Sequence, residues 1–336
     1  SVDSNSFNNF SNKMNIDNIK EKDPVMPLMG APGIRLNDSS LRENLNDWEL
    51  QFRTLSTLVE RFQPDGIFPF MDLTVELDSL GLKINFPEND NPSVAEHPVA
   101  GEKEINNLRK NWNGITGRMK IFIKLMEKMA SEFSILNNGY VIGPFTMAGE
   151  LMGVNELAMN VIQKPGLVQQ LLDFSLEVIS EYSRALFNAG ADTIMVLEPT
   201  PVILSAEQYQ EFSMNPFQEL VERVDNLPLF LHICGDTTHL LPSMAESGAV
   251  GLSLDSDVKF AKVEGVTGYI IIMGNLDPIE VFLNSTPEEV KESTRKLMDT
   301  MKKRDNFILS SGCDLPVSTP LDNITDFMET GRESKR

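Results

Sequence analysis

Short apolar runs alternate with longer amphipathic segments along most of this chain. Within the amphipathic segments apolar residues recur at helical spacing, as between Leu45 and Phe62 and between Leu167 and Leu186. This alternation is typical of repeated strand–helix units around a parallel sheet, and eight apolar runs match the strand number of a (β/α)8 TIM barrel. The sequence therefore predicts an α/β barrel. The eight predicted strands are Val25–Met29, Gly66–Phe70, Tyr140–Gly143, Thr193–Leu197, Leu229–Ile233, Val250–Leu254, Tyr269–Met273 and Phe307–Ser310.

Several predicted helices begin with recognisable capping residues. Thr286 is followed three residues later by Glu289, and Ser205 is followed in the same way by Gln208. This spacing forms a capping box, in which each side chain bonds to the other residue's backbone N–H. Pro165 occupies the first position of another helix, where proline is favoured.

Two segments depart from the strand–helix alternation. Residues 1–23 are rich in Ser, Asn and charged residues, which predicts a disordered or expression-derived N-terminal segment. Residues 73–111 contain several prolines, glycines and asparagines, which predict an irregular insertion lying over the barrel mouth. We expect residues 24–336 to form a single barrel domain that includes this insertion.

The charge composition excludes some classes of partner. The chain has 29 Lys and Arg against 49 Asp and Glu, a net charge of −20 without a basic cluster. Because such a surface repels phosphate backbones and anionic headgroups, we expect no nucleic-acid or membrane partner. No run approaches the roughly 20 apolar residues of a spanning helix, and no secretion signal is recognisable. These features predict a cytoplasmic protein.

Both cysteines of the chain lie close to predicted strand ends. His232 and Cys234 are two residues apart, so their side chains point to the same face of the strand. Cys313 follows another predicted strand. Since barrel active sites lie at the carboxyl ends of strands, we expect the three to converge at one mouth. One imidazole and two thiolates with an open fourth position are typical of catalytic zinc.

The spacing alone leaves other interpretations of these residues open. His232 is also compatible with a hydrogen-bonded core histidine, and the cysteines with small buried apolar residues. A redox-active cysteine pair is a third interpretation.

Three further polar residues follow predicted strands. We predict that Glu198 fills the fourth zinc position at rest or orients His232, the alternative being a solvated loop carboxylate. Asn275 and Asp277 follow the seventh strand, where barrel loops contact ligands, and we predict that they bind the cofactor. A purely structural turn role is equally compatible with these two residues.

Several motifs resemble the uroporphyrinogen decarboxylase superfamily, and within it the cobalamin-dependent methyltransferases that pass a methyl group to coenzyme M. The resemblance extends from Pro24 to Asn323. The motifs are FMDL at 70–73 with LG at 80–81, GPFTMA at 143–148, FLHICGD at 230–236, GNLDP at 274–278, SSGCDLP at 310–316 and TPLDNI at 319–324.

The resemblance implies a zinc site and a reaction. The zinc methyltransferases of this superfamily carry a His-x-Cys pair and a distant Cys, which match His232, Cys234 and Cys313. A free thiol has a pKa near ~8.5, and coordination to Zn²⁺ removes its proton while the sulfur stays nucleophilic. The expected reaction moves a methyl group from a methylated corrinoid (methylcobamide) to a zinc-bound small thiol, with coenzyme M as the expected acceptor. Arg35 is then a candidate for holding its sulfonate.

The chain lacks the Asp-x-His-x-x-Gly stretch that cobalamin-binding domains resemble. We therefore expect the corrinoid to arrive free or on a separate corrinoid protein.

Two alternative functions remain on the same barrel. A cofactor-free decarboxylase of the uroporphyrinogen type is similar in fold and in the carboxylate at Asp72, which we predict contacts substrate. Such decarboxylases, however, carry an arginine-rich segment after the first strand, whereas residues 29–35 here hold only Arg35. Because buried substrate carboxylates need paired charges or several donors, decarboxylation is the weaker interpretation. A non-catalytic barrel that binds a corrinoid protein is the other alternative.

Overall fold

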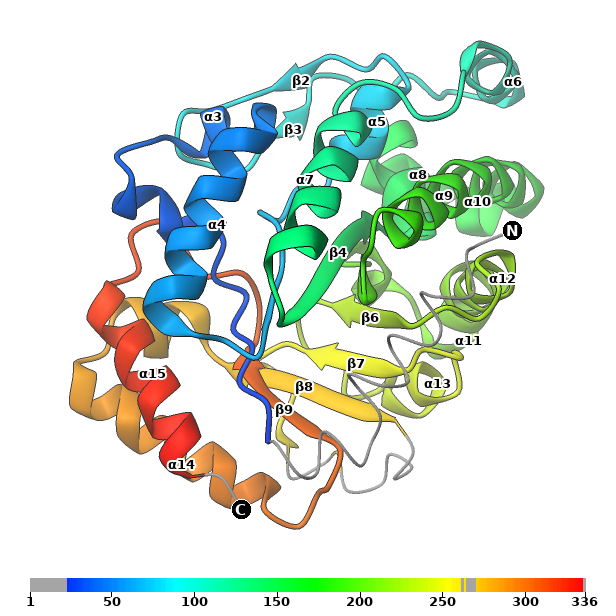
Figure 1. Cartoon of the computed structure of the whole chain (residues 1–336). Coiled ribbons are helices and arrows are strands. Elements are labelled where there is room, and N and C mark those ends of the chain that lie inside the picture. Colours follow the sequence, from blue (N-terminus) through cyan, green and yellow to red (C-terminus); the bar gives the residue numbers. More distant parts are fainter. Residues whose placement is uncertain (1–22, 261–262, 264–269, 335–336) are drawn as a thin grey trace.

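The computed structural model describes residues 23–260, 263 and 270–334 (Figure 1). The prediction for the N-terminal segment, apart from Asp23, lies outside the described residues. In the described ranges no helix is both long enough and apolar enough to cross a membrane.

Seven parallel strands form a curled sheet with the order β1-β4-β5-β6-β7-β8-β9 (Figure 1). A separate antiparallel pair consists of β2 and β3. The strands of the large sheet are β1 (Gly66–Ile67), β4 (Leu136–Ile142), β5 (Thr193–Leu197), β6 (Leu229–Ile233), β7 (Gly251–Leu254), β8 (Ile271–Leu276) and β9 (Phe307–Ser311).

The first predicted strand occupies the place between β9 and β1. Val25 forms a parallel bridge with Leu309, and the Met26 N–H donates to the Leu309 carbonyl over 2.9 Å. On the other side the Asp65 N–H donates to the Val25 carbonyl over 3.1 Å. The first and last strand regions are thereby joined, and the predicted α/β barrel class is confirmed.

The predicted strand limits are confirmed best where both faces of a strand are apolar. The structure gives β5 and β6 the predicted bounds. By contrast, β4 begins at Leu136 rather than Tyr140, because the polar residues Asn137 and Asn138 continue the pairing. The Asn138 amide donates to the Ile67 carbonyl over 3.1 Å, so its polarity is satisfied between strands. The predicted start of the seventh strand, Tyr269, lies outside the described residues.

Helices follow the strands and cover the outer face of the sheet (Figure 1). The predicted helix from Leu45 to Phe62 divides at Asp47, whose carboxylate accepts the first N–H groups of α4. The two predicted capping boxes, at Ser205 and Thr286, are confirmed. The helices are η1 (Ala31–Leu36), α3 (Leu41–Asn46), α4 (Trp48–Phe62), α7 (Met119–Glu132), α8 (Pro144–Met152), α9 (Val154–Gln163), α10 (Pro165–Asn188), η2 (Thr200–Ile203), α11 (Ala206–Tyr209), η3 (Gln210–Met214), α12 (Asn215–Arg223), α13 (Leu241–Ala245), η5 (Pro278–Leu283), α14 (Pro287–Met301) and α15 (Leu321–Glu333).

The insertion is more regular than its composition predicts. It contains α5 (Val75–Ser79), the strands β2 (Ile84–Asn85) and β3 (Ser93–Val94), and α6 (Glu102–Asn111). The prediction of an irregular segment was wrong for α6, where acidic residues in the first turn and basic residues in the last support a short helix.

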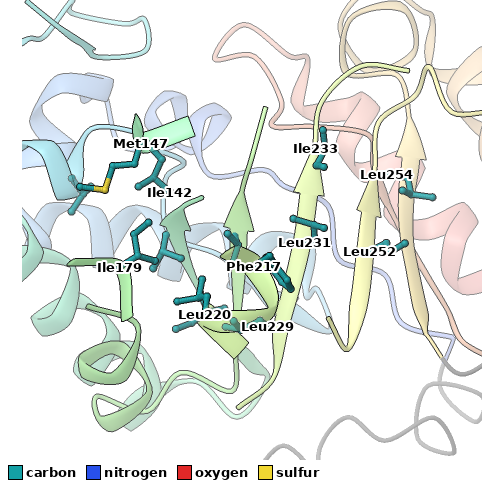
Figure 2. Close-up of a cluster of buried hydrophobic side chains, with 14 of the residues drawn as sticks. Ile142, Met147, Ile179, Phe217, Leu220, Leu229, Leu231, Ile233, Leu252 and Leu254 are labelled. Carbon is teal, nitrogen blue, oxygen red and sulfur yellow. The ribbon is translucent and has the colours of Figure 1, made fainter. Parts of the chain in front are cut away.

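Alternation along β6 separates two apolar cores and sets the orientation of His232. Leu229, Leu231 and Ile233 pack outward against the helices, as Figure 2 shows. Phe230 belongs to the other core, inside the barrel, together with Met26, Leu28, Phe68, Leu136, Tyr140, Met195, Leu197, Ile271, Met273 and Ile308. Because successive side chains alternate, His232 shares the inner face with Phe230.

Candidate metal centre

Three predicted ligands meet at the carboxyl ends of β6 and β9. The Cys234 Sγ lies 3.2 Å from the His232 Nε2, and the Cys313 Sγ lies 3.7 Å from both of those atoms. In the described part of the chain they form the one group of His, Cys or acidic residues that could hold a metal ion. The predicted convergence at the barrel mouth is therefore confirmed.

The donor atoms fit tetrahedral zinc. With Zn–S bonds of ~2.3 Å and a Zn–N bond of ~2.0 Å, tetrahedral angles place two sulfurs roughly 3.8 Å apart and nitrogen and sulfur roughly 3.5 Å apart. The distance between the Cys234 and Cys313 sulfurs is 3.7 Å, and the nitrogen–sulfur distances are 3.2 and 3.7 Å. The two thiols and the imidazole thus match such an ion in chemistry and spacing.

Ser253 on β7 orients the imidazole of His232. The two residues are register partners in the sheet. The His232 Nδ1 lies 3.0 Å from the Ser253 Oγ and 3.2 Å from the Ser253 carbonyl oxygen. Since a carbonyl only accepts, this contact favours the proton on Nδ1 and leaves the Nε2 lone pair facing the sulfurs. Ser253 was not identified from the sequence, because its contact depends on strand register.

Asp255 shapes the turn beyond Cys234. Its carboxylate accepts the Gly235 N–H over 3.0 Å, and Gly235 has a φ of +85°, a conformation that favours glycine. The sequence analysis missed Asp255 as well, since the contact joins the turns that follow two neighbouring strands.

The close approach of the three side chains changes their proton affinities. Burial lowers the pKa of His232, but the Cys313 sulfur and the charge of Asp255 outweigh this effect and raise the pKa overall. The hydrogen bond from Cys313 lowers the pKa of Cys234, whereas that same bond and burial raise the pKa of Cys313 well above its usual value. These shifts favour ionisation of Cys234 and oppose that of Cys313, so a divalent cation would stabilise the fully ionised pair.

His232, Cys234 and Cys313 are called the metal-ligand group below. Glu198 is buried and does not belong to this group. Its carboxylate accepts the Thr146 N–H over 2.8 Å at the start of α8 and the Ser213 hydroxyl over 3.2 Å. Its backbone N–H donates to the His232 carbonyl over 2.8 Å. The alternative of a solvated loop carboxylate was wrong, because Glu198 has no exposed surface. Burial raises the pKa of Glu198 to about 7.

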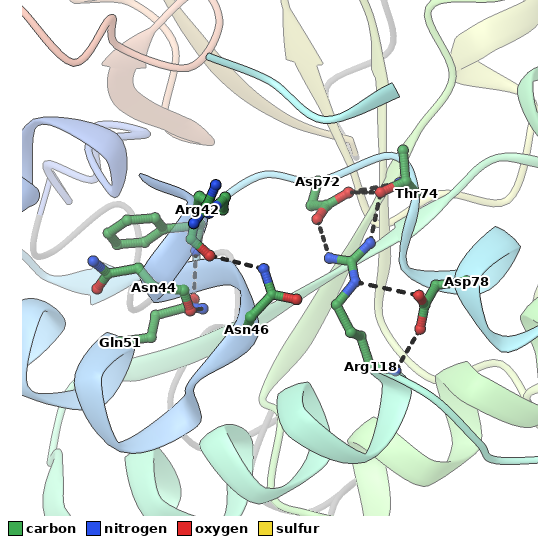
Figure 3. Close-up of polar contacts among 9 residues, drawn as sticks. Arg42, Asn44, Asn46, Gln51, Asp72, Thr74, Asp78 and Arg118 are labelled. Atoms are coloured by element: carbon green, nitrogen blue, oxygen red, sulfur yellow. Dashed lines mark hydrogen bonds and ion pairs between the residues drawn. The ribbon is translucent and has the colours of Figure 1, made fainter. Parts of the chain in front are cut away.

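Asp72 forms a buried ion pair with Arg118 (Figure 3). Its Oδ1 accepts the Thr74 N–H over 2.6 Å, and the Arg118 guanidinium also donates to the Thr74 hydroxyl over 2.6 Å. Arg118 lies over the Phe86 ring at 4.7 Å. Both carboxylate oxygens of Asp72 are therefore engaged within the chain. Sequence analysis missed Arg118, which is 46 residues from Asp72 and follows no predicted strand.

Glu76 lies on α5 beside this pair and is fully buried. Its Oε1 accepts the Ile142 N–H over 2.9 Å, whereas its Oε2 has no hydrogen-bond partner among the described residues. Burial raises the pKa of Glu76 to about 7. Sequence analysis missed Glu76, because a glutamate in a short helix is usually exposed.

Asn275 and Asp277 make local backbone contacts. The Asn275 amide donates to the carbonyls of Asp255 and Val258, each over 2.8 Å. Asp277 caps η5, accepting the N–H groups of two following residues over 2.8 and 2.9 Å, and accepts the Ser256 hydroxyl over 3.3 Å. Both residues thus hold the turn next to the metal ligands.

A cavity of about 540 Å³ opens beside Cys313. Residues 89–91 of the insertion form one wall, and the segment after β9 forms another. Arg35 lies near the rim, where its guanidinium donates to the carbonyls of Ser318 and Thr319 over 3.3 and 2.8 Å. The lining residues are Ala31, Leu41, Met71, Asn89, Asp90, Asn91, Cys313, Asp314, Leu315, Pro316, Val317 and Ser318.

Comparison with known proteins adds a family match. The family model described as uroporphyrinogen decarboxylase (URO-D) matches residues 24–334. A methylcobamide:CoM methyltransferase MtbA of Methanosarcina mazei is 31% identical over 273 residues, covering 79% of this chain and 78% of the relative. A uroporphyrinogen decarboxylase of Prochlorococcus marinus is 26% identical, covering 89% and 87%. A solved methyltransferase structure from Methanosarcina mazei superposes with a TM-score of 0.84 at 23% identity, covering 95% and 98%, which supports the fold.

Proposed function

Because the chain belongs to the uroporphyrinogen decarboxylase family, we propose that it is a zinc-dependent methyltransferase of the methylcobamide:thiol type. The donor is a methylated corrinoid, free or on a corrinoid protein, and the acceptor is a small thiol. Coenzyme M is the acceptor that we propose first, because the names of similar proteins include it. The observation that carries the proposal is the convergence of His232, Cys234 and Cys313.

Zinc held by these three residues would leave a fourth position open. An acceptor sulfur bound there would be a thiolate at neutral pH. The chain's own residues prepare this position. Ser253 fixes the His232 tautomer, Asp255 fixes the turn after Cys234, and the cavity gives a small molecule access beside Cys313.

The proposed reaction moves a methyl group from cobalt to sulfur. The acceptor thiol releases its proton, and its sulfur lone pair forms the new S–C bond. The Co–C bond of the corrinoid substrate breaks, and both of its electrons remain on cobalt. The products are a methyl thioether and the reduced corrinoid.

The other predicted site residues take supporting roles in this proposal. Glu198 positions His232 through their backbone hydrogen bond and joins that strand end to α8. Asn275 and Asp277 hold the turn at 255–258 on the side of the mouth where we place the corrinoid. Asp72, paired with Arg118, fixes the loop after β1 at the substrate side. This pairing also weakens the decarboxylase alternative, in which Asp72 would face substrate.

The test combines metal content with methyl transfer. Protein purified without chelators is assayed for zinc per chain and for demethylation of methylcobalamin in the presence of a thiol. We expect about one zinc per chain, and loss of both zinc and activity in H232A and C313S. H239A is the matched control, because His239 is exposed and outside the ligand group. A zinc-loaded wild type that transfers no methyl group to any thiol would contradict the proposal.

A further inference from the structure

The two cysteines of the metal-ligand group lie close enough to react with each other. Cys234 and Cys313 are the only cysteines of the chain, so a disulfide within one molecule must join them. Their sulfurs are 3.7 Å apart. A disulfide bond is ~2.05 Å long, and the two atoms would therefore approach by roughly 1.7 Å to form it.

The position of both residues in the fold permits this approach. The register pairs of β6 end at Ile233 and those of β9 end at Ser311, so Cys234 and Cys313 lie just beyond the paired part of the sheet. Rotation of their side chains breaks no strand pair. The two sulfurs can therefore close on each other while the barrel stays intact.

A small oxidant has access to the pair. Both cysteines are partly exposed, and Cys313 lines the cavity of about 540 Å³ at the barrel mouth. A sulfenic acid formed at either sulfur would meet the neighbouring thiol at contact distance. Condensation of a sulfenic acid with a thiol gives a disulfide, and this reaction then competes well with further oxidation.

The metal-bound form and the disulfide form exclude each other. Zinc binds cysteine as the thiolate, and the sulfurs of a disulfide no longer carry that charge. Oxidation of the pair would leave His232 as the one remaining ligand of the group, which is too few for a protein zinc site. Bound zinc in turn would engage the sulfur lone pairs that attack an oxidant.

We infer that Cys234 and Cys313 form a reversible disulfide when a hydroperoxide reaches the site, and that this oxidation prevents metal binding until a thiol reductant reverses it. The regulatory consequence rests on the proposed function, because loss of zinc would stop methyl transfer. The disulfide itself requires only the cysteine pair.

The oxidation removes two electrons from the pair. One cysteine sulfur attacks a peroxide oxygen and the O–O bond breaks. The departing oxygen takes the thiol proton and leaves as an alcohol, or as water from hydrogen peroxide. The second sulfur then attacks the resulting sulfenic acid, so that the S–S bond forms and the S–O bond breaks. Hydroxide takes the second thiol proton and leaves as water, and one hydroperoxide has been reduced.

Hydrogen peroxide and the purified protein test the inference. Wild type is made metal-free with a chelator that is then removed, treated with a small excess of peroxide, unfolded and assayed for free thiols. It should lose both thiols, and the peptides that carry Cys234 and Cys313 should be recovered as one linked pair, lighter by two hydrogen atoms than the separate peptides. Dithiothreitol should restore both thiols and zinc binding. Zinc-loaded wild type should release about one zinc to an indicator for each disulfide formed.

Two variants separate the cysteine pair from the complete metal-ligand group. C234S keeps Cys313 alone, so peroxide should add oxygen to this sulfur or cross-link two molecules, without an internal loss of two hydrogen atoms. H232A keeps both cysteines and lacks the imidazole ligand. It should therefore form the disulfide to the same extent with and without added zinc.

The inference and the proposed function fail in different ways. Metal-free wild type that keeps both thiols, that is oxidised to sulfinic acids instead, or that binds zinc with the disulfide intact would overturn the inference. None of these results bears on methyl transfer by the reduced, zinc-loaded protein. Conversely, a reduced protein that forms the disulfide with peroxide but transfers no methyl group to any thiol would overturn the proposed function and leave the disulfide established.

Discussion

The metal-ligand group and the Asp72–Arg118 pair are two polar regions of one barrel, and their polar atoms find partners in different ways. Asp72 meets a cation supplied by the chain, and Thr74 completes its hydrogen bonds. His232, Cys234 and Cys313 instead present electron-pair donors to one another. The charges of the first arrangement are paired within the protein, whereas the second arrangement is suited to an added cation. Internal charge pairing thus distinguishes this structural polar cluster from the candidate binding site.

The largest effect should come from breaking the internal pair. R118M leaves the Asp72 carboxylate buried without its cation, which should lower the free energy of unfolding by about 3–5 kcal/mol. Urea denaturation measures this change, and zinc content of the folded protein should stay at the wild-type value. R223M is the control, because Arg223 forms an exposed pair with Glu219 that contributes little. Equal stability of R118M and the wild type would remove the distinction between the two regions.

Glu76 should make the same region sensitive to pH. Its pKa is about 7 in the folded protein and 4.5 when unperturbed, so the folded state holds the proton more tightly. The resulting stabilisation is fully present below about pH 4.5 and is lost as pH rises through 7, amounting to roughly 3 kcal/mol. The stability of E76Q relative to the wild type should therefore rise by that amount between pH 4.5 and 8. Parallel pH profiles for the two proteins would contradict this assignment.

In the metal-ligand group, S253A should weaken zinc binding without removing it. The variant loses the hydroxyl contact with His232 Nδ1 but keeps the backbone carbonyl. Loss of such an orienting contact typically costs about tenfold in metal affinity. Competition with a chelating zinc indicator measures the change, and T238A is the control because Thr238 bonds to Asp236 instead. Unchanged affinity in S253A would show that the carbonyl alone orients the ring.

The smallest effect should come from Asp277. D277A removes the cap of η5 and should cost about 1 kcal/mol in stability, whereas D277N should retain the cap. If Asp277 acts only on the turn, kcat/KM for methylcobalamin should change little in D277N. A large loss of kcat/KM in a D277N protein of normal stability would instead indicate direct contact with the corrinoid.

The sequence predicted most of the sheet and the His232–Cys234 pair by short-range rules, whereas Cys313 was added through the predicted barrel and the family resemblance. A period of two placed His232 and Cys234 on one face, and continuous apolar runs marked β5 and β6. The extension of β4 through Asn137 and Asn138 was missed, because their polar groups are satisfied only by neighbouring strands.

The residues that support the site required three-dimensional information. Ser253 contacts His232 through strand register, and Asp255 contacts Gly235 across neighbouring turns. Arg118 reaches Asp72 from a distant helix start. Glu198 was identified by its position after a strand, but its carboxylate is directed to the start of α8, a direction that no spacing rule provides.

The bridge between Val25 and Leu309 links metal binding to the order in which a ribosome makes the chain. Val25 is synthesised long before Leu309, its partner in β9, and Leu309 lies only four residues before Cys313. Earlier parts of the chain fold as they emerge from the ribosome. Barrel closure and completion of the three candidate ligands therefore both require the stretch from Leu309 to Cys313. A prematurely terminated product that ends before β9 carries His232 and Cys234 but neither closes its barrel nor assembles a three-ligand centre. With zinc bound as proposed, its retention reports that the chain extends through β9 to Cys313.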